Sequence, residues 1–393
     1  MQYVQERIVS SIFKKRLAYG LLLLYIVMSF ISLSVESKVP SYFILCVASL
    51  ISVISLSERM PTSNLAILVL SFSALLSMAL FSNRNYEIFA LINNAVFFLF
   101  SYLICFLIFK LNLSKKIAIA LFIISHGYFL LFSLYRYHID GGIDENTFNS
   151  MFYMSSRNIV SAILLTITIF FFSVFYVKDR KIYTSVLGVD LICSLLLYGR
   201  SGILLSFSLF FFGFYIKYFR ANTIKSLSFI LSFLIALTLV IVINFDYILV
   251  LCNDLITKTN LQSGLDTPRL VMWFDYITNF NVNILFRGTA FEFSPLITSF
   301  EGNPHNSYIM FQARFGIVGF LFVFVIFSIW VRVFFKNIIL GGLLSLVFVR
   351  MFLDSYALFS YFDFLWMYML LFLNKDSSRQ KDEKININNY SCL

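Results

Sequence analysis

The sequence predicts an all-α integral membrane protein with about twelve transmembrane helices and one large loop, outside the cytoplasm, that contains short helices. The first observation is composition: hydrophobic residues make up 60% of the 393 residues, charged residues 13%, and the mean hydropathy is +0.86. A soluble domain usually carries about 25% charged residues. The second observation is a series of apolar runs of near-spanning length. Each run is predicted to be a helix, because an isolated strand leaves backbone hydrogen bonds unsatisfied in hydrocarbon.

The predicted spans form a single polytopic domain over residues 1–373. The first span follows Lys14, Lys15 and Arg16 and has no small-residue cleavage site, so it is expected to be retained. Residues 374–393, rich in Lys, Asp, Ser and Asn, are expected to be a disordered cytoplasmic tail. The twelve predicted spans are 17–35, 41–57, 64–82, 88–109, 115–134, 158–177, 182–198, 201–217, 225–248, 315–334, 336–353 and 356–373.

The distribution of basic residues predicts the orientation. With both termini in the cytoplasm, 20 of the 30 Lys and Arg residues fall in cytoplasmic segments, as the positive-inside rule requires. The net charge of +10 therefore reflects topology, and nucleic acid is not an expected partner. The five cysteines have no CxxC spacing and indicate no disulfide framework.

Two loops outside the cytoplasm exceed turn length, at about 135–157 and 249–314, and long ordered loops are commonly functional. In the second loop, the start of a helix is predicted at Pro268, which places Arg269, Trp273 and Tyr276 on one helix face. Either this is an interfacial helix, with the tryptophan as anchor and the arginine reaching lipid headgroups, or the arginine faces an anionic substrate.

The same loop contains a second helix start at Asn303-Pro304, which places His305 in the first helical turn. A helix N-terminus disfavours imidazolium, so His305 is expected to be neutral and able to accept a proton. Tyr308 and Gln312 would share its face. The alternative is a surface histidine that caps a re-entrant helix.

Ionisable groups at span ends and inside spans are further candidates. Arg200 lies between glycines in Tyr198-Gly199-Arg200-Ser201-Gly202, and Arg157 begins the sixth span. Each is either a ligand contact or a boundary residue that reaches the interface. Four more ionisable residues lie in or near spans and either pair with one another or serve function; they are His126, Asp190, Arg350 and Asp363.

Several chemistries are not indicated. The segment Asp140–Glu145 lacks the spacing of a calcium loop, and no metal or other cofactor is expected. The chain has no P-loop, no GxGxxG and no Ser/His/Asp signature in a plausible context, which argues against ATP-driven chemistry.

The layout of spans and loop, and an ordered set of short motifs, resemble the O-antigen polymerase and ligase superfamily of bacterial membrane glycosyltransferases. The resemblance in layout covers most of the chain. The motifs are Gly199-Arg200-Ser201-Gly202, Arg269-x3-Trp273, Gly288, His305-Asn306-Ser307-Tyr308 and Gly316-x2-Gly319. The fuller glycine pattern that often precedes the family histidine is reduced here to Arg287-Gly288.

The resemblance implies an inner-membrane enzyme that polymerises undecaprenyl-pyrophosphate-linked repeat units of O-antigen or capsule on the periplasmic face, without a metal. It implies His305 as the base, with Arg200, Arg269 and, more weakly, Arg157 on the pyrophosphate. Asn306, Tyr308 and Arg287 are further candidate substrate contacts. The implied partners are the lipid-linked glycan donor and acceptor, the bilayer and a chain-length regulator protein. The alternatives are an O-antigen ligase acting on lipid A core and a flippase of lipid-linked sugars, although no internal repeat favours transport.

Overall fold

The computed structural model describes residues 2–81, 88–144, 146–153, 156–218, 268–358 and 360–375. Over these ranges the chain is helical and contains no strand, and eight of its helices are long and apolar enough to cross a membrane. The all-α fold class is therefore confirmed, and the fold is that of a membrane-embedded protein. The eight helices are α1 (Gln2–Ser34), α2 (Val39–Leu56), α3 (Thr62–Phe81), α4 (Ile88–Lys110), α5 (Ser114–Asp140), α6 (Arg157–Asp179), α8 (Arg200–Tyr218) and α14 (Ser307–Lys336).

Three predicted spans fall on shorter helices: α7 (Thr184–Leu196), α15 (Ile338–Leu353) and α16 (Asp363–Leu371). The predicted span 225–248 lies outside the described residues, as do residues 376–393 of the predicted tail. A continuous helix over 356–373 is wrong, because the chain bends before α16. The carboxylate of Asp363 accepts hydrogen bonds from the backbone N–H of Leu358 (3.0 Å) and Ser360 (2.9 Å), which holds a turn in place of helix.

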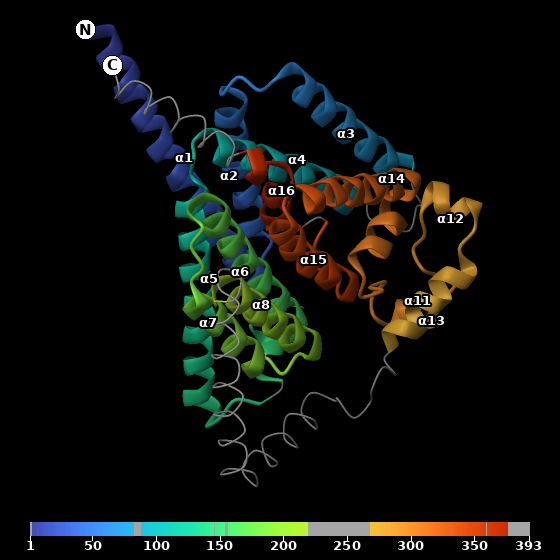
Figure 1. The fold of residues 1–393 in the computed structure, drawn as a ribbon. Helices are drawn as coiled ribbons and strands as arrows, with labels where there is room; N and C mark the ends of the chain where they lie inside the picture. The colour runs from blue at the N-terminus through green and yellow to red at the C-terminus, as the bar shows by residue number, and fades with distance from the viewer. Residues whose placement is uncertain are drawn as a thin grey trace.

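Helix α6 lies at the centre of the bundle (Figure 1), where it packs against α5, α7, α8, α15 and α16. From Val160 to Val177 every residue of α6 is buried. Helices that are apolar on all sides belong in the interior, and here the neighbouring helices take the place of lipid around α6. Helices α1–α4 and α14 cover one side of this core, with α3 at its edge.

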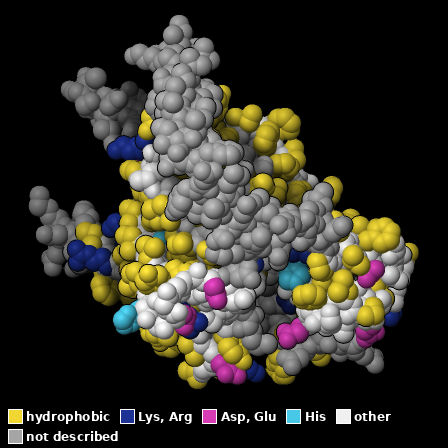
Figure 2. Space-filling view, turned by 90° about the horizontal axis from the view of Figure 1, so that it is seen from below, with side chains coloured by type: hydrophobic (Ala, Val, Ile, Leu, Met, Phe, Trp, Pro, Cys, Tyr) yellow, Lys and Arg dark blue, Asp and Glu magenta, His cyan; other side chains and the backbone are white. Residues whose placement is uncertain are grey.

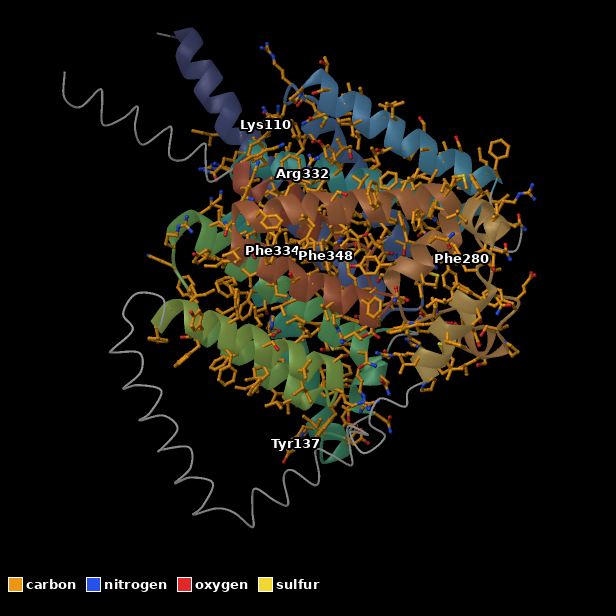
Figure 3. All side chains as sticks on the ribbon, turned by 45° about the vertical axis from the view of Figure 1, so that its right-hand side comes forward. Lys110, Tyr137, Phe280, Arg332, Phe334 and Phe348 are labelled. Atoms are coloured by element: carbon orange, nitrogen blue, oxygen red, sulfur yellow. The ribbon has the colours of Figure 1, made fainter. Side chains whose placement is uncertain are left out.

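Labelled residues mark the two ends of the bundle (Figure 3). Lys110 of α4 and Arg332 of α14 lie near each other at one end, which we call the basic end, whereas Phe280 lies at the opposite, loop end (Figure 3). The view from below shows acidic side chains on a polar part of the surface, next to hydrophobic side chains (Figure 2). Lys110 and Arg332 at one end fit the predicted topology, which assigns both residues to the cytoplasmic side.

The loop end contains three short helices, α11 (Pro268–Asn279), α12 (Val282–Arg287) and α13 (Pro295–Ser299). They share a small hydrophobic core with the start of α14, formed by Met272, Tyr276, Ile284, Phe291, Ile297 and Ala313. Residues 268–314 of the predicted second loop are thus folded, with short helices as expected, and residues 249–267 lie outside the described residues.

The other predicted loop, 135–157, is shorter than expected. Helix α5 continues to Asp140, where Gly141 ends it in the left-handed conformation (φ 72°). An Arg136–Asp140 ion pair of 2.9 Å supports this last turn, so charged residues extend the helix past the apolar run. A 3₁₀ turn, η1 (Thr147–Ser150), precedes α6.

Helix α14 bends sharply at Gly316, whose backbone is left-handed (φ 52°). A Cβ at this position would lie 2.2 Å from the carbonyl oxygen of Phe286 in α12, and a Cβ at Gly319 would lie 2.6 Å from that of Phe311. Both glycines of the Gly316-x2-Gly319 motif are therefore required by close backbone contacts. The bend separates a short first segment, Ser307–Phe315, from the longer apolar segment (Figure 1).

Candidate functional site

The candidate site is a group of three basic side chains around one buried carboxylate, that of Asp354, at the end of α15. Arg269 donates from Nη2 to Oδ1 (3.0 Å), Arg350 Nη2 lies 3.2 Å from Oδ2, and His305 Nδ1 lies 3.9 Å from Oδ1. Arg269 also donates from Nη1 to the carbonyl of Leu353 (2.8 Å). Residues from α11, α15 and the segment before α14 therefore meet at one point.

Arg350 connects this point to the first turns of α6 and α8. Its side chain is fully buried; Nη2 donates to the carbonyl oxygen of Asn158 (2.5 Å) and Nη1 donates to the hydroxyl of Ser201. Of the four ionisable residues predicted in or near spans, Arg350 thus belongs to the candidate site. It pairs with Asp354, which is not one of those four residues, because a buried guanidinium needs an opposite charge.

The predicted arginines Arg157 and Arg200 each directly precede a residue that Arg350 contacts. Arg157 is the first residue of α6 and Arg200 the first of α8. Both make interactions of their own, and each is next in sequence to a residue that accepts a hydrogen bond from Arg350. The close approach of α6 and α8 explains Gly202, since a Cβ there would lie 2.0 Å from Ser161 Oγ.

Helix α11 turns one face toward α14 and the Asp354 carboxylate, as its sequence predicts. Arg269 binds Asp354, Trp273 donates from Nε1 to the carbonyl of Pro304 (2.9 Å), and the hydroxyl of Tyr276 donates to Gln312 Oε1. The helix begins at Pro268 in the described residues. Protein groups therefore supply polar contacts for Arg269 and Trp273, which favours the interpretation in which the arginine belongs to a site.

His305 does not lie in a helical turn, which corrects the sequence interpretation. Helix α14 begins at Ser307, and its cap is Asn306, whose side chain accepts from the backbone N–H of Tyr308 (3.0 Å) and Ile309 (3.1 Å). His305 precedes the cap with a left-handed backbone (φ 50°), and Asn303 Oδ1 accepts its N–H (2.9 Å). Left-handed non-glycine residues are strained and persist where surrounding contacts hold them, often at functional sites.

The surroundings of His305 favour its neutral form. Burial lowers the pKa of the imidazole below its ordinary value of 6.5, and the nearby Arg269 guanidinium lowers it further, whereas Asp354 acts in the opposite direction. The sequence predicts the same neutrality from a helix dipole, but the cause here is desolvation together with a neighbouring cation. With Nδ1 toward Asp354 and 22% of the side chain exposed, His305 can accept a proton.

The weaker candidates have structural positions. Asn306 is 1% exposed and caps α14, and Tyr308 donates its hydroxyl to the carbonyl of Phe348 (3.1 Å). Arg287 is exposed at the end of α12 and is not among the basic side chains that contact Asp354 in the described residues. Its neighbour Gly288 is explained by packing, because a Cβ there would lie 2.0 Å from the carbonyl oxygen of Ala313.

Two cavities of different character flank the first segment of α14. An apolar groove of about 600 Å³ runs along one side, and its lining includes Trp273, Tyr308, Phe327, Trp330 and Phe348. A polar cavity of about 320 Å³ lies on the other side, between this segment and the turn before α16. Ser307 lines the polar cavity and donates to the carbonyl of Asp354 (2.7 Å).

The arrangement suits an anionic ligand that also carries an apolar group. Two arginines and one aspartate leave a net charge of +1 beside a neutral histidine, and guanidinium groups match phosphate oxygens in geometry. Arg269 is 22% exposed and accessible, whereas Arg350 is inside the protein and holds the helices together. A proton acceptor, an anion site and an apolar groove thus occur side by side.

Asp354 was not among the sequence candidates, although it is the residue that gathers the others. The sequence feature that could have indicated Asp354 is the Arg350-x3-Asp354 spacing at the end of an apolar run, which places opposite charges one helical turn apart. The remaining intramembrane groups have structural partners: His126 Nε2 lies 3.6 Å from Asp190 Oδ1, and Asp363 accepts from Trp366 Nε1 (3.0 Å).

In the part of the chain that the structure describes, there is no group of three or more His, Cys, Asp or Glu side chains able to hold a metal ion. In the Asp140–Glu145 segment, Asp144 Oδ1 accepts from the N–H groups of Asn146 (3.0 Å) and Thr147 (2.7 Å), so this carboxylate stabilises its own turn.

Comparison with known proteins adds no assignment: no family model, no curated protein and no solved structure matches this chain.

Proposed function

We propose that the chain is a membrane glycosyltransferase that polymerises undecaprenyl-pyrophosphate-linked oligosaccharide repeat units of O-antigen or capsule on the periplasmic face of the bacterial inner membrane. In this proposal both termini face the cytoplasm, so the basic end is cytoplasmic and the loop end periplasmic. The observation that carries the proposal is the group formed by His305, Arg269 and Asp354 at the border of an apolar groove.

The proposed reaction is an inverting displacement at the anomeric carbon of the donor sugar. His305 accepts the proton of the acceptor hydroxyl as its oxygen bonds to that carbon. The bond from the anomeric carbon to the pyrophosphate oxygen breaks, and its electron pair leaves with the pyrophosphate. Arg269 stabilises the developing charge, and Arg200 and Arg157 approach from the first turns of α8 and α6.

Asp354 orients the two side chains that act on the substrates, Arg269 and His305. It fixes the Arg269 guanidinium by an ion pair of 3.0 Å and faces Nδ1 of His305 at 3.9 Å. A carboxylate beside one ring nitrogen favours the proton on that nitrogen, which leaves Nε2 as the acceptor. Asp354 is therefore a positioning residue in this reaction.

The apolar groove provides a place for the polyprenyl tail. Its lining is almost wholly apolar and includes Trp273 and Tyr308, which lie close to the arginine and histidine. A lipid tail in this groove would place the pyrophosphate at the end where Arg269 lies. This position supports a lipid pyrophosphate over a soluble sugar nucleotide as the donor.

The direct test is turnover by the purified protein of a synthetic polyprenyl-pyrophosphate oligosaccharide, with a chelator present. His305→Ala should lower the rate by about 10²–10⁴-fold, the usual contribution of a positioned base. The matched control is His138→Ala, because His138 is exposed at the end of α5 and should be dispensable. Wild-type protein that makes no polymer, or His305→Ala protein that keeps full activity, refutes the proposal.

A deletion strain separates the polymerase from its two alternatives. Lipid A core that carries a single repeat unit indicates loss of a polymerase, whereas bare core indicates loss of a ligase. Lipid-linked repeats that accumulate on the cytoplasmic face indicate loss of a flippase. If the protein is a polymerase, its expected protein partner is a chain-length regulator.

A further inference from the structure

We infer that the polar cavity beside His305 binds the saccharide that supplies the attacking hydroxyl, separately from the apolar groove that takes the lipid tail. This inference rests on the proposed function and deepens it by assigning the acceptor sugar to a place. The polar cavity has a volume of about 320 Å³ and is lined by Phe300, Glu301, Asn303, Ser307, Met310, Arg314, Ser355, Tyr356, Ala357, Leu358 and Ser360.

The lining of the cavity suits a hydroxyl-rich ligand. Its wall combines serine hydroxyls, an amide and two charged side chains, Glu301 and Arg314, whereas the groove on the other side of α14 is apolar. Saccharides bind through several hydrogen bonds from such groups. The cavity size is at the lower end of small-molecule sites, which run from about 300 Å³ upward.

One hydroxyl in the wall lacks the partner that burial demands. The Oγ atom of Ser355 is buried and makes no hydrogen bond among the described residues. A buried polar group without a partner costs stability unless water or a ligand completes it. A rotation of the Ser355 side chain toward the cavity would let a sugar hydroxyl supply that hydrogen bond.

The backbone around the cavity is held in strained conformations. Glu301 (φ 55°) and Leu358 (φ 66°), both in the wall, are left-handed, as is His305 (φ 50°). Non-glycine residues in this region cost energy and concentrate at ligand sites. Left-handed residues thus occur in two separate segments of the cavity wall and beside it, at 301–305 and at 358.

Two residues of the cavity wall are hydrogen-bonded to the backbone of His305 or Asp354. Asn303, in its wall, holds the backbone N–H of His305 (2.9 Å). Ser307, also in the wall, donates to the Asp354 carbonyl (2.7 Å). These two residues bring the cavity within two residues of His305 along the chain. In this inference the saccharide extends from the cavity toward the imidazole, while the lipid pyrophosphate approaches from the opposite side of the first segment of α14. The acceptor hydroxyl and the pyrophosphate leaving group would thus lie on opposite sides of the anomeric carbon, as a displacement with inversion requires.

The test uses two changes at one position in the full-length protein. Ser355→Phe should fill the cavity, whereas Ser355→Ala keeps it open and removes only the hydroxyl that lacks a partner. The probe is the free repeat-unit oligosaccharide, released by mild acid from the lipid-linked glycans of the source strain, and binding is measured by saturation-transfer NMR. Wild type should bind it, Ser355→Ala should bind it more weakly, and Ser355→Phe should not bind it. In turnover, Ser355→Phe should raise the acceptor KM by about tenfold or more, with donor binding retained.

The outcomes separate this inference from the proposed function. Equal oligosaccharide binding by folded Ser355→Phe and wild type overturns the inference, whether or not polymer is made. Ser355-dependent binding without turnover supports the saccharide site and refutes the polymerase. If Ser355→Phe does not fold, Arg314→Gln serves as the second variant. A change in the acceptor KM in that variant supports the inference, and an unchanged KM overturns it.

Discussion

Replacing Asp354 by Asn tests the buried charge group at the centre of the site. Arg350 is fully buried and Asp354 is 1% exposed, so solvent does not screen their 3.2 Å pair. Removal of one partner from such a pair costs about 3–5 kcal/mol, because an uncompensated charge stays buried. Arg350 would keep its hydrogen bonds to Asn158 and Ser201, so we expect the lower end, about 3 kcal/mol.

The chain contains a matched control for this experiment. Arg136 and Asp140 form the same Arg-x3-Asp pair near the end of α5, at 2.9 Å, but both side chains are about one-third exposed (31% and 36%). Asp140→Asn should cost less than about 1 kcal/mol, as exposed ion pairs do. The assay is reversible unfolding of both variants in mixed detergent micelles. Equal losses in the two variants, or a loss below about 0.5 kcal/mol for Asp354→Asn, would refute the reasoning.

Three further predictions concern other parts of the molecule. The acid limb of kcat/KM should have its midpoint below pH 6.5, because His305 acts when neutral and its pKa is lowered; a midpoint above 6.5 in a pH–rate profile contradicts this. Gly202→Ala should destabilise by about 1–3 kcal/mol through contact with Ser161, and Ser161→Gly should restore melting temperature in the double variant. Asp190→Leu should cost about 1–3 kcal/mol by removing the carboxylate that accepts from the Thr168 and Ser206 hydroxyls, yet turnover per folded molecule should be unchanged, since His126 and Asp190 lie outside the site.

Sequence reasoning located the fold class, most helices and the face of α11 that contributes to the candidate site. Apolar runs of the length of α4 or α6 admit a helical interpretation only, because lipid excludes the alternatives. The periodicity of Arg269, Trp273 and Tyr276 gave their common face correctly, because an isolated helix of this kind obeys simple spacing.

The errors came from contacts between segments distant in sequence. His305 was placed inside a helix because Asn303-Pro304 resembles a helix start, whereas the structure uses Asn306 as the cap. Asp354 was missed because its partners Arg269 and His305 lie far away along the chain. The apolar run at 356–373 hid a turn, because only the folded chain shows which N–H groups the Asp363 carboxylate accepts.

The bend at Gly316 sets the angle of the short segment of α14 next to His305, and so the position of this histidine. The segment from Ser307 to Phe315 spans about 13 Å at 1.5 Å per residue, so a 10° change at the bend would move its far end by about 2 Å. Misplacement of a catalytic group by about 1 Å can cost two orders of magnitude in rate. Contacts of Gly316 with Phe286, and of Gly288 with Ala313, resist such a swing from both sides of the hinge point. Substitutions in α12, remote from any substrate, should therefore slow the chemistry by rotating the short arm that carries His305.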